Sequence, residues 1–210
     1  MLSTYYTIKG YGTHEIMIQK SKFITYVNRA ETEEEAQTFI QSIKKKHHDA
    51  THNCSAYLIG KNDEIQKAND DGEPSGTAGI PMLEVLKKRQ LKNTVVVVTR
   101  YFGGIKLGAG GLIRAYGSAT SEGINAVGVV KRTLMQIMHA TFDYTYIGKI
   151  ENELHHSPYK IKNTKYAEQV EMEIYVESGK KEDFIEWMTN MTNGKATFRT
   201  GDVEYLEERA

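Results

Sequence analysis

The sequence predicts a protein of two α+β domains. In the N-terminal part, strand-like and helix-like runs alternate, and residues 95–98 form a continuous run of valine, which is typical of a strand buried on both faces. After about Arg132 the predicted order becomes strand, helix, strand, strand, helix, strand, which is the order of the ferredoxin-like fold. We therefore expect one domain at residues 1–132 and a ferredoxin-like domain at residues 133–210.

The elements of the N-terminal part can be assigned in order along the chain. Residues 14–30 contain two β-rich runs, as in a hairpin or a bent strand. Thr32 begins a helix, because Glu35 completes a capping box and apolar residues then recur at helical spacing. Residues 52–60 alternate as a half-buried strand does, and Pro81 lies in the first turn of a second helix.

A long helix and the C-terminal elements follow. Residues 107–126 are rich in glycine and alanine, and they predict a helix that approaches its neighbour closely. Residues 170–176 alternate apolar and polar side chains, as in a strand with one buried face. Residues 184–191 place Trp187 and three other large apolar side chains at helical spacing. Both patterns describe a packed core and require no ligand.

The composition limits the possible functions. The chain has 210 residues, of which 40% are hydrophobic and 26% charged, as is ordinary for a globular protein. Its formal net charge is +0, so an anion-binding site must be local. Cys54 is the only cysteine, which excludes an intrachain disulfide and a multi-cysteine zinc site. No apolar run approaches the ~20 residues that cross a bilayer, and the N-terminus does not resemble a signal peptide, so we expect a cytoplasmic protein with no membrane partner.

The most unusual stretch runs from residue 70 to residue 116, where two loops rich in small residues flank the valine strand. In the second loop, successive glycines could aim backbone N–H groups into a concave nest, and the following helix start adds positive potential. Nearby basic side chains could add charged donors for a phosphate, a carboxylate or an RNA backbone. The candidate anion- or RNA-binding residues are Arg100, Gly103, Gly104, Lys106, Gly108, Gly110, Gly111 and Arg114.

The same loop also has a purely structural interpretation, in which its glycines serve tight turns and close packing of the helix. Two nucleotide-binding motifs are excluded. No GK[ST] follows at the Walker A spacing, and GAGGL does not complete a G-x-G-x-x-G fingerprint. Anion binding and packing therefore remain as alternatives at this loop.

The first loop supplies a second candidate set of carboxylates and hydroxyls. Clustered oxygen atoms could hold magnesium or calcium, although the spacing does not complete an EF-hand. The alternative, which we favour, is that Asp70 and Asp71 cap a turn and pair with Arg100 or Arg114. We therefore expect neither a metal nor a cofactor. The residues of this set are Asp70, Asp71, Glu73, Ser75 and Thr77.

A third possibility is nucleophilic catalysis by Cys54 beside His52. The two residues are two apart on a predicted strand, so their side chains share a face, and a thiolate beside a histidine is reactive. Cys54 also shares that face with Ala56 and Leu58, which is typical of a core cysteine. Because no complete catalytic group can be assembled around it, we assign no catalytic residue.

Three segments in order resemble the signature of the IMPACT/YigZ family. They are ATHNCSAY at residues 50–57, DDGEPSGTAGIPMLEVL at 70–86 and VVVVTRYFGGIKLGAGGLIRAY at 95–116. The motif R-[FYW]-[FYW]-G-G-x-x-L-G occupies residues 100–108 and is highly specific for this family. The resemblance covers about residues 1–130, and the C-terminal part resembles the small ferredoxin-like domain of bacterial YigZ-type members.

The resemblance implies a ribosomal-protein-type α+β fold for the N-terminal domain, similar to domains of elongation factor G and of small-molecule kinases. It implies that the C-terminal domain is similar to another module of elongation factor G. Eukaryotic IMPACT proteins regulate translation, with an additional N-terminal RWD domain that we do not find in this sequence. For bacterial members the resemblance implies a role near nucleic acid, ribosomes or translation.

These observations leave two main hypotheses of function and an open oligomeric state. The first is a non-enzymatic regulator or binding module, linked to translation, that binds RNA, the ribosome or a translation-related protein through the glycine-rich basic loop. The second is an enzyme or sensor that recognises a small phosphorylated or acidic metabolite at the same loop. Fold likeness alone does not choose between them.

Overall fold

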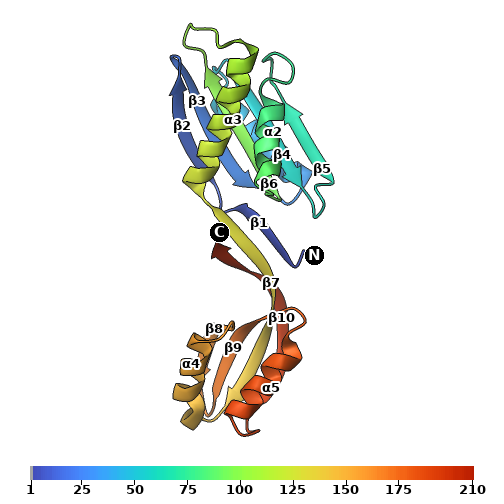
Figure 1. Ribbon diagram of the computed structural model, residues 1–210, viewed down its shortest axis with the longest axis vertical. Coiled ribbons are helices and arrows are strands. Elements are labelled where there is room, and N and C mark those ends of the chain that lie inside the picture. The colour runs from blue at the N-terminus through green and yellow to red at the C-terminus, as the bar shows by residue number, and fades with distance from the viewer. Residues whose placement is uncertain (1) are drawn as a thin grey trace. The chain divides into compact units, whose positions relative to one another are not determined.

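The computed structural model describes residues 2–210, which form two compact α+β units (Figure 1). One unit comprises Tyr5–Lys131 with Glu208–Ala210, and the other comprises Arg132–Glu207 with the segment up to Thr4. The predicted α+β class is confirmed.

The N-terminal unit is built on a five-stranded sheet of order β2-β3-β6-β4-β5. Each neighbouring pair in this sheet is antiparallel. The central strand β6 carries the valine run 95–98, and all four valines are fully buried, as the run predicted. The strands are β2 (Gly12–Ile18), β3 (Ser21–Arg29), β4 (His52–Ile59), β5 (Ile65–Asn69) and β6 (Thr94–Tyr101).

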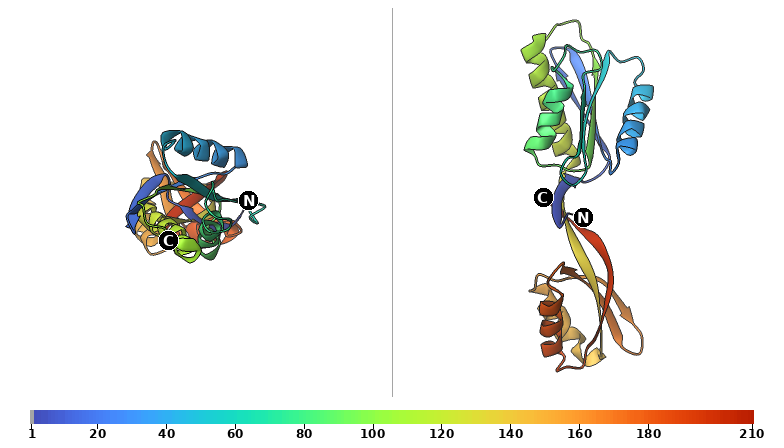
Figure 2. Two further views of the ribbon diagram at one scale, coloured as in Figure 1. Left: turned by 90° about the horizontal axis from the view of Figure 1, so that it is seen from above. Right: turned by 90° about the vertical axis from the view of Figure 1, so that its right-hand side faces the viewer.

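Helices cover both faces of this sheet (Figure 2). Helix α1 (Glu33–Lys46) packs on one face, where Thr32 accepts a hydrogen bond from the Glu35 N–H, as the capping box predicted. Helices α2 (Gly79–Lys88) and α3 (Gly108–Val127) pack on the other face. The central valines alternate between the hydrophobic cores on the two faces of the sheet, so β6 is packed on both faces. The position of its end, where the next loop begins, is therefore fixed.

The C-terminal unit has the predicted order of strand, helix, strand, strand, helix, strand, with a short 3-10 turn η1 (Tyr144–Tyr146) before its first helix. In its sheet, β9 lies between β7 and β8 and is antiparallel to both, and β10 also pairs with β7. The elements are β7 (Val129–Phe142), α4 (Ile147–His155), β8 (Lys160–Tyr166), β9 (Val170–Glu177), α5 (Lys181–Met191) and β10 (Thr197–Arg209).

One face of the C-terminal sheet is packed against both helices. Its core joins Met138 and Met172 of the sheet with Ile150 of α4 and Phe184 of α5, all fully buried. The alternate residues of β7 and β9 therefore point to the opposite face, which no helix of residues 132–207 covers.

Two short strands are not predicted by the sequence pattern. Strand β5 exposes four of its five side chains, so it lacks the apolar alternation by which strands are recognised. Strand β1 (Thr4–Ile8) is held by pairing with β7, which is distant from it along the chain. Both depend on partners that no local pattern reveals.

Candidate functional site

The candidate site lies where β6 ends and α3 begins. A loop over residues 102–107 joins the two elements, and its side chains at Phe102, Ile105 and Lys106 are exposed. Ile113 and Arg114, on the first turns of α3, are exposed as well. We call these five side chains, with the backbone of residues 108–110, the loop–helix surface.

Arg100 lies beneath this surface rather than on it. Its guanidinium is 2.7 Å from the Glu73 carboxylate, and the two side chains are only 6% and 4% exposed. The rings of Phe23 and Phe102 lie 5.4 and 5.5 Å from the guanidinium carbon. A second nitrogen of Arg100 donates to the Ser21 hydroxyl at 3.3 Å. Arg100 is thus committed to a buried ion pair, and its charge acts on the surface only from below.

Glu73 is the centre of this buried group. The oxygen that pairs with Arg100 also accepts the Tyr116 hydroxyl at 2.7 Å, and the other lies 3.7 Å from His52 Nε2. Burial raises the pKa of Tyr116, with Cys54 and Glu73 adding to the effect, so the phenol stays protonated and donates. Sequence reasoning missed Tyr116, because a tyrosine on the apolar side of a helix has the pattern of a core residue.

The loop that contains Asp70 is organised by its own backbone. The Asp70 carboxylate accepts N–H groups from Gly76, Ala78 and Gly79 at 2.8 to 3.0 Å. Burial alone would raise the pKa of Asp70, but these three donors together lower it. The carboxylate therefore binds the start of α2 to the loop, which is a structural role.

The other members of the first-loop set have partners of their own. Asp71 binds Lys44 at 2.5 Å and the Asn53 N–H at 2.7 Å, while the Thr77 hydroxyl donates to the Pro74 carbonyl. Ser75 is exposed. The carboxylates of this loop point to different partners and do not converge on one point.

The glycines of the second loop differ in what requires them. A Cβ at Gly103 would lie 2.0 Å from the Lys20 carbonyl oxygen, and one at Gly111 would lie 3.0 Å from Leu107 Cβ, so both serve packing. Gly104 and Gly108 have φ of +87° and +70°, which favours glycine. Gly110 has neither requirement, since a Cβ there would meet only the Arg114 guanidinium at 3.6 Å.

The N-terminus of α3 is electrostatically positive. Within residues 2–210, no side chain caps it and no acidic residue lies in its first turn. The first N–H groups of a helix have no intrahelical partner and carry the positive end of the helix dipole. Because exposed Lys106 and Arg114 flank them, the loop–helix surface offers both backbone and side-chain donors to an anion.

Cys54 has the environment of a core thiol. It is fully buried, and its Sγ donates to the Asp70 carbonyl at 3.0 Å. Burial raises the pKa of the Cys54 thiol, and nearby Glu73, Asp71 and Asp70 raise it further, so the thiol is protonated at neutral pH. His52 Nδ1 is occupied by the Asp71 carbonyl at 2.8 Å. This geometry favours the structural interpretation of the pair.

Comparison with known proteins identifies the family. The model of the Impact N-terminal domain matches residues 19–124, which contain the whole loop–helix surface, and the model of a domain of unknown function, DUF1949, matches residues 141–195. The chain is 64% identical to the IMPACT family member YvyE of Bacillus subtilis (strain 168), over 99% of this chain and 96% of that protein. The chain belongs to the IMPACT family.

Two further comparisons agree with this membership. The IMPACT family member YigZ of Escherichia coli (strain K12) is 34% identical over 84% of this chain and 88% of that protein. A solved structure, described as the crystal structure of a hypothetical protein, superposes with a TM-score of 0.62 at 29% identity, covering 96% of this chain and 99% of the other. In this IMPACT family chain, no helix of residues 2–210 is long and apolar enough to cross a membrane.

Proposed function

We propose that this chain is a non-enzymatic binding module, linked to translation, that holds the phosphate backbone of RNA on the loop–helix surface. The observation that carries the proposal is the uncapped N-terminus of α3 with Lys106 and Arg114 exposed beside it, where Gly110 leaves the helix backbone uncovered. Glycine in the first turns of a helix costs stability relative to alanine, and neither packing nor backbone conformation requires it there. Without a Cβ at Gly110, a ligand can approach the helix backbone at this point.

The charges nearby define what such a ligand would be. The uncapped N-terminus of α3, with Lys106 and Arg114 exposed beside it, favours phosphate oxygens. The exposed ring of Phe102 offers a face on which a base can stack. The link to translation comes from the family, whose eukaryotic members regulate translation. Since the formal net charge is +0, binding would be local and strongly weakened by salt.

Removing the two exposed cations should weaken RNA binding. We expect Lys106→Ala/Arg114→Ala to lower the affinity for a fluorescein-labelled uridine oligonucleotide at least tenfold at low salt. The slope of log affinity against log salt should also fall by about 1.4, since each phosphate contact on a single strand contributes roughly 0.7. Fluorescence anisotropy at several salt concentrations measures both quantities.

The matched control is Lys61→Ala/Lys88→Ala, which removes two exposed lysines elsewhere in the same unit. Equal binding by both double variants, or no binding by the wild type, would refute the proposal.

Substitution of Gly110 should separate stability from binding. We expect Gly110→Ala to raise the free energy of unfolding by up to about 1 kcal/mol and yet to weaken RNA binding severalfold. Gly117→Ala is the control, because Gly117 also lies in α3 and an added Cβ there would have nothing within 4 Å. It should stabilise the fold equally and leave affinity unchanged. Urea denaturation and anisotropy give the two readouts, and equal affinities for the two variants would remove the argument from Gly110.

A small phosphorylated or acidic metabolite is the alternative ligand of the same surface. The observation that favours it is the small span of the donors, since the free N–H groups lie within one turn of α3, the size of a single phosphate. Thermal-shift measurements with nucleotides and sugar phosphates test this alternative. A ligand at 100 times its dissociation constant should stabilise the protein by about 2.7 kcal/mol. A shift with such a compound, without RNA binding, would favour the metabolite.

A further inference from the structure

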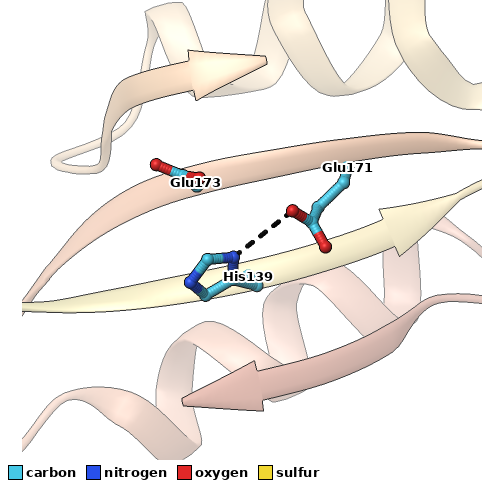
Figure 3. A group of neighbouring side chains, drawn as sticks. All are labelled: His139, Glu171 and Glu173. Atoms are coloured by element: carbon cyan, nitrogen blue, oxygen red, sulfur yellow. Dashed lines mark ion pairs between the residues drawn. The ribbon is translucent and has the colours of Figure 1, made fainter. Parts of the chain in front are cut away.

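A group of metal-ligating side chains lies on the helix-free face of the C-terminal sheet, apart from the loop–helix surface. His139 of β7 and Glu171 and Glu173 of β9 each present a ligand atom there, and these atoms all lie within 4.8 Å of one another (Figure 3). His139 is the cross-strand partner of Glu173, and Glu171 lies two residues from Glu173 on β9, so its side chain is on the same face. Because all three stand on two neighbouring strands whose other face is packed, their backbone positions are fixed.

The His139 ring is oriented with an unprotonated nitrogen toward the carboxylates. Nδ1 lies 2.9 Å from a guanidinium nitrogen of Arg199 and 3.5 Å from Glu171. A guanidinium only donates hydrogen bonds, so Nδ1 must be the acceptor and carries a lone pair. On the other side of the ring, Gly201 of β10 packs against Nε2, where a Cβ would come within 2.6 Å. The lone pair of Nδ1 therefore lies beside the carboxylates, and an imidazole lone pair is what ligates a metal.

Two cations balance the carboxylates in the present arrangement. Lys165 lies 2.8 Å from Glu173 and 3.4 Å from Glu171, and Arg199 lies 4.0 Å from Glu171. Their own side chains are 57% and 63% exposed. Exposed ion pairs of this kind contribute little and exchange readily with solvent.

We propose that His139, Glu171 and Glu173 bind a divalent first-row transition metal, in the place that the charges of Lys165 and Arg199 now fill. One imidazole and two carboxylates are ligands of Zn²⁺ and of its neighbours in the series, and three protein ligands leave a coordination position open to water or substrate. In a tetrahedral site, ligand atoms stand roughly 3.4 Å apart. The three side chains must therefore close in by rotation, and this becomes possible when Arg199 and Lys165 swing outward into solvent.

Zn²⁺ alone is the probe, titrated into the full chain in competition with a chromophoric chelator. We expect one site that His139→Ala and Glu173→Gln each weaken at least tenfold. His14→Ala is the matched control, since His14 forms a similar histidine–glutamate pair at 3.5 Å in the N-terminal unit. It should leave the affinity for the site unchanged. Circular dichroism confirms that each variant is folded, and Glu173→Gln keeps the shape of the side chain.

A second test is Lys165→Ala, because a metal bound at this site would compete with the Lys165 ammonium for the same two carboxylates. Removing the competing ammonium should tighten Zn²⁺ binding severalfold, whereas Lys162→Ala should change it little, since Lys162 on the same strand pairs with Glu204 instead. In the wild type, Zn²⁺ should also raise the unfolding temperature, and His139→Ala should abolish that shift. An affinity unchanged in His139→Ala and Glu173→Gln, or weaker in Lys165→Ala, would overturn the proposal and leave an ion-pair network.

Discussion

Replacing Arg100 by alanine is expected to lower the free energy of unfolding by about 3–5 kcal/mol. The reason is the carboxylate that remains behind. Glu73 is 4% exposed, and without the guanidinium its charge would keep, among residues 2–210, the Tyr116 hydroxyl as a close donor and the more distant His52 ring. A buried charge without its partner is among the most costly defects in a folded protein.

Urea denaturation followed by circular dichroism measures this loss. Arg89→Ala is the matched control, because Arg89 is also hydrogen-bonded, but to the neutral partners Asn125 and Ser121. That variant should lose only about 0.5–1.5 kcal/mol. If Arg100→Ala lowers the free energy of unfolding no more than Arg89→Ala does, Glu73 does not depend on Arg100 to balance its buried charge.

A triple variant separates the net contribution of the Arg100–Glu73 pair to the free energy of unfolding from the cost of removing one of its partners. Arg100→Met/Glu73→Leu/Tyr116→Phe replaces the whole buried group with apolar side chains of similar size. Since such replacements are often neutral or stabilising, we expect it to recover most of the stability lost in Arg100→Ala. One nitrogen of Arg100, Nε, is buried with no hydrogen-bond partner in the described part of the chain, which makes the native group less than ideal. No recovery in the triple variant would show that the polar group itself stabilises the fold.

Local signals predicted much of the fold because they are local in their physics. The capping box at Thr32 needs only a neighbour three residues away, and it is present as expected. The valines at residues 95–98 predicted a strand buried on both faces, and they form the centre of the sheet. The alternation in β9 likewise predicted one packed face. In each case, residues that are neighbours along the chain are enough to predict the element that they form.

The candidate sites depend on contacts that no local pattern contains. Glu73 contacts Arg100, which is 27 residues away along the chain, and Tyr116, which is 43 residues away. The sequence pattern predicted Asp70 or Asp71 as the partner of Arg100, and the residue that pairs with it is Glu73. His139 and Glu173 come together only through the register of β7 against β9. Such pairings are set by the register of one strand against its neighbour. A register shift of one residue would turn every side chain of the strand to the other face of the sheet.

Gly103→Ala is expected to destabilise the N-terminal unit by about 1–3 kcal/mol, because the new methyl group has no room. Its Cβ would lie 2.0 Å from the Lys20 carbonyl oxygen and 2.6 Å from the Ser21 nitrogen. Both atoms are backbone, so no side-chain rotation can relieve the contact. The Gly103 N–H also donates to the Ser21 hydroxyl at 3.2 Å, and this bond would be strained as the loop moves away.

The same displacement should reach the loop–helix surface, since Gly103 anchors one end of residues 102–107 to the turn between β2 and β3. We therefore expect Gly103→Ala to weaken RNA binding as well, even at temperatures where the variant is fully folded. Urea denaturation and fluorescence anisotropy measure the two effects. Gly10→Ala is the control, because Gly10 lies in a loop with nothing within 4 Å of an added Cβ. It should change stability by less than about 0.5 kcal/mol. If Gly103→Ala and Gly10→Ala have equal free energies of unfolding, the loop is not anchored at Gly103. The exposed side chains of the loop would then move independently of β6.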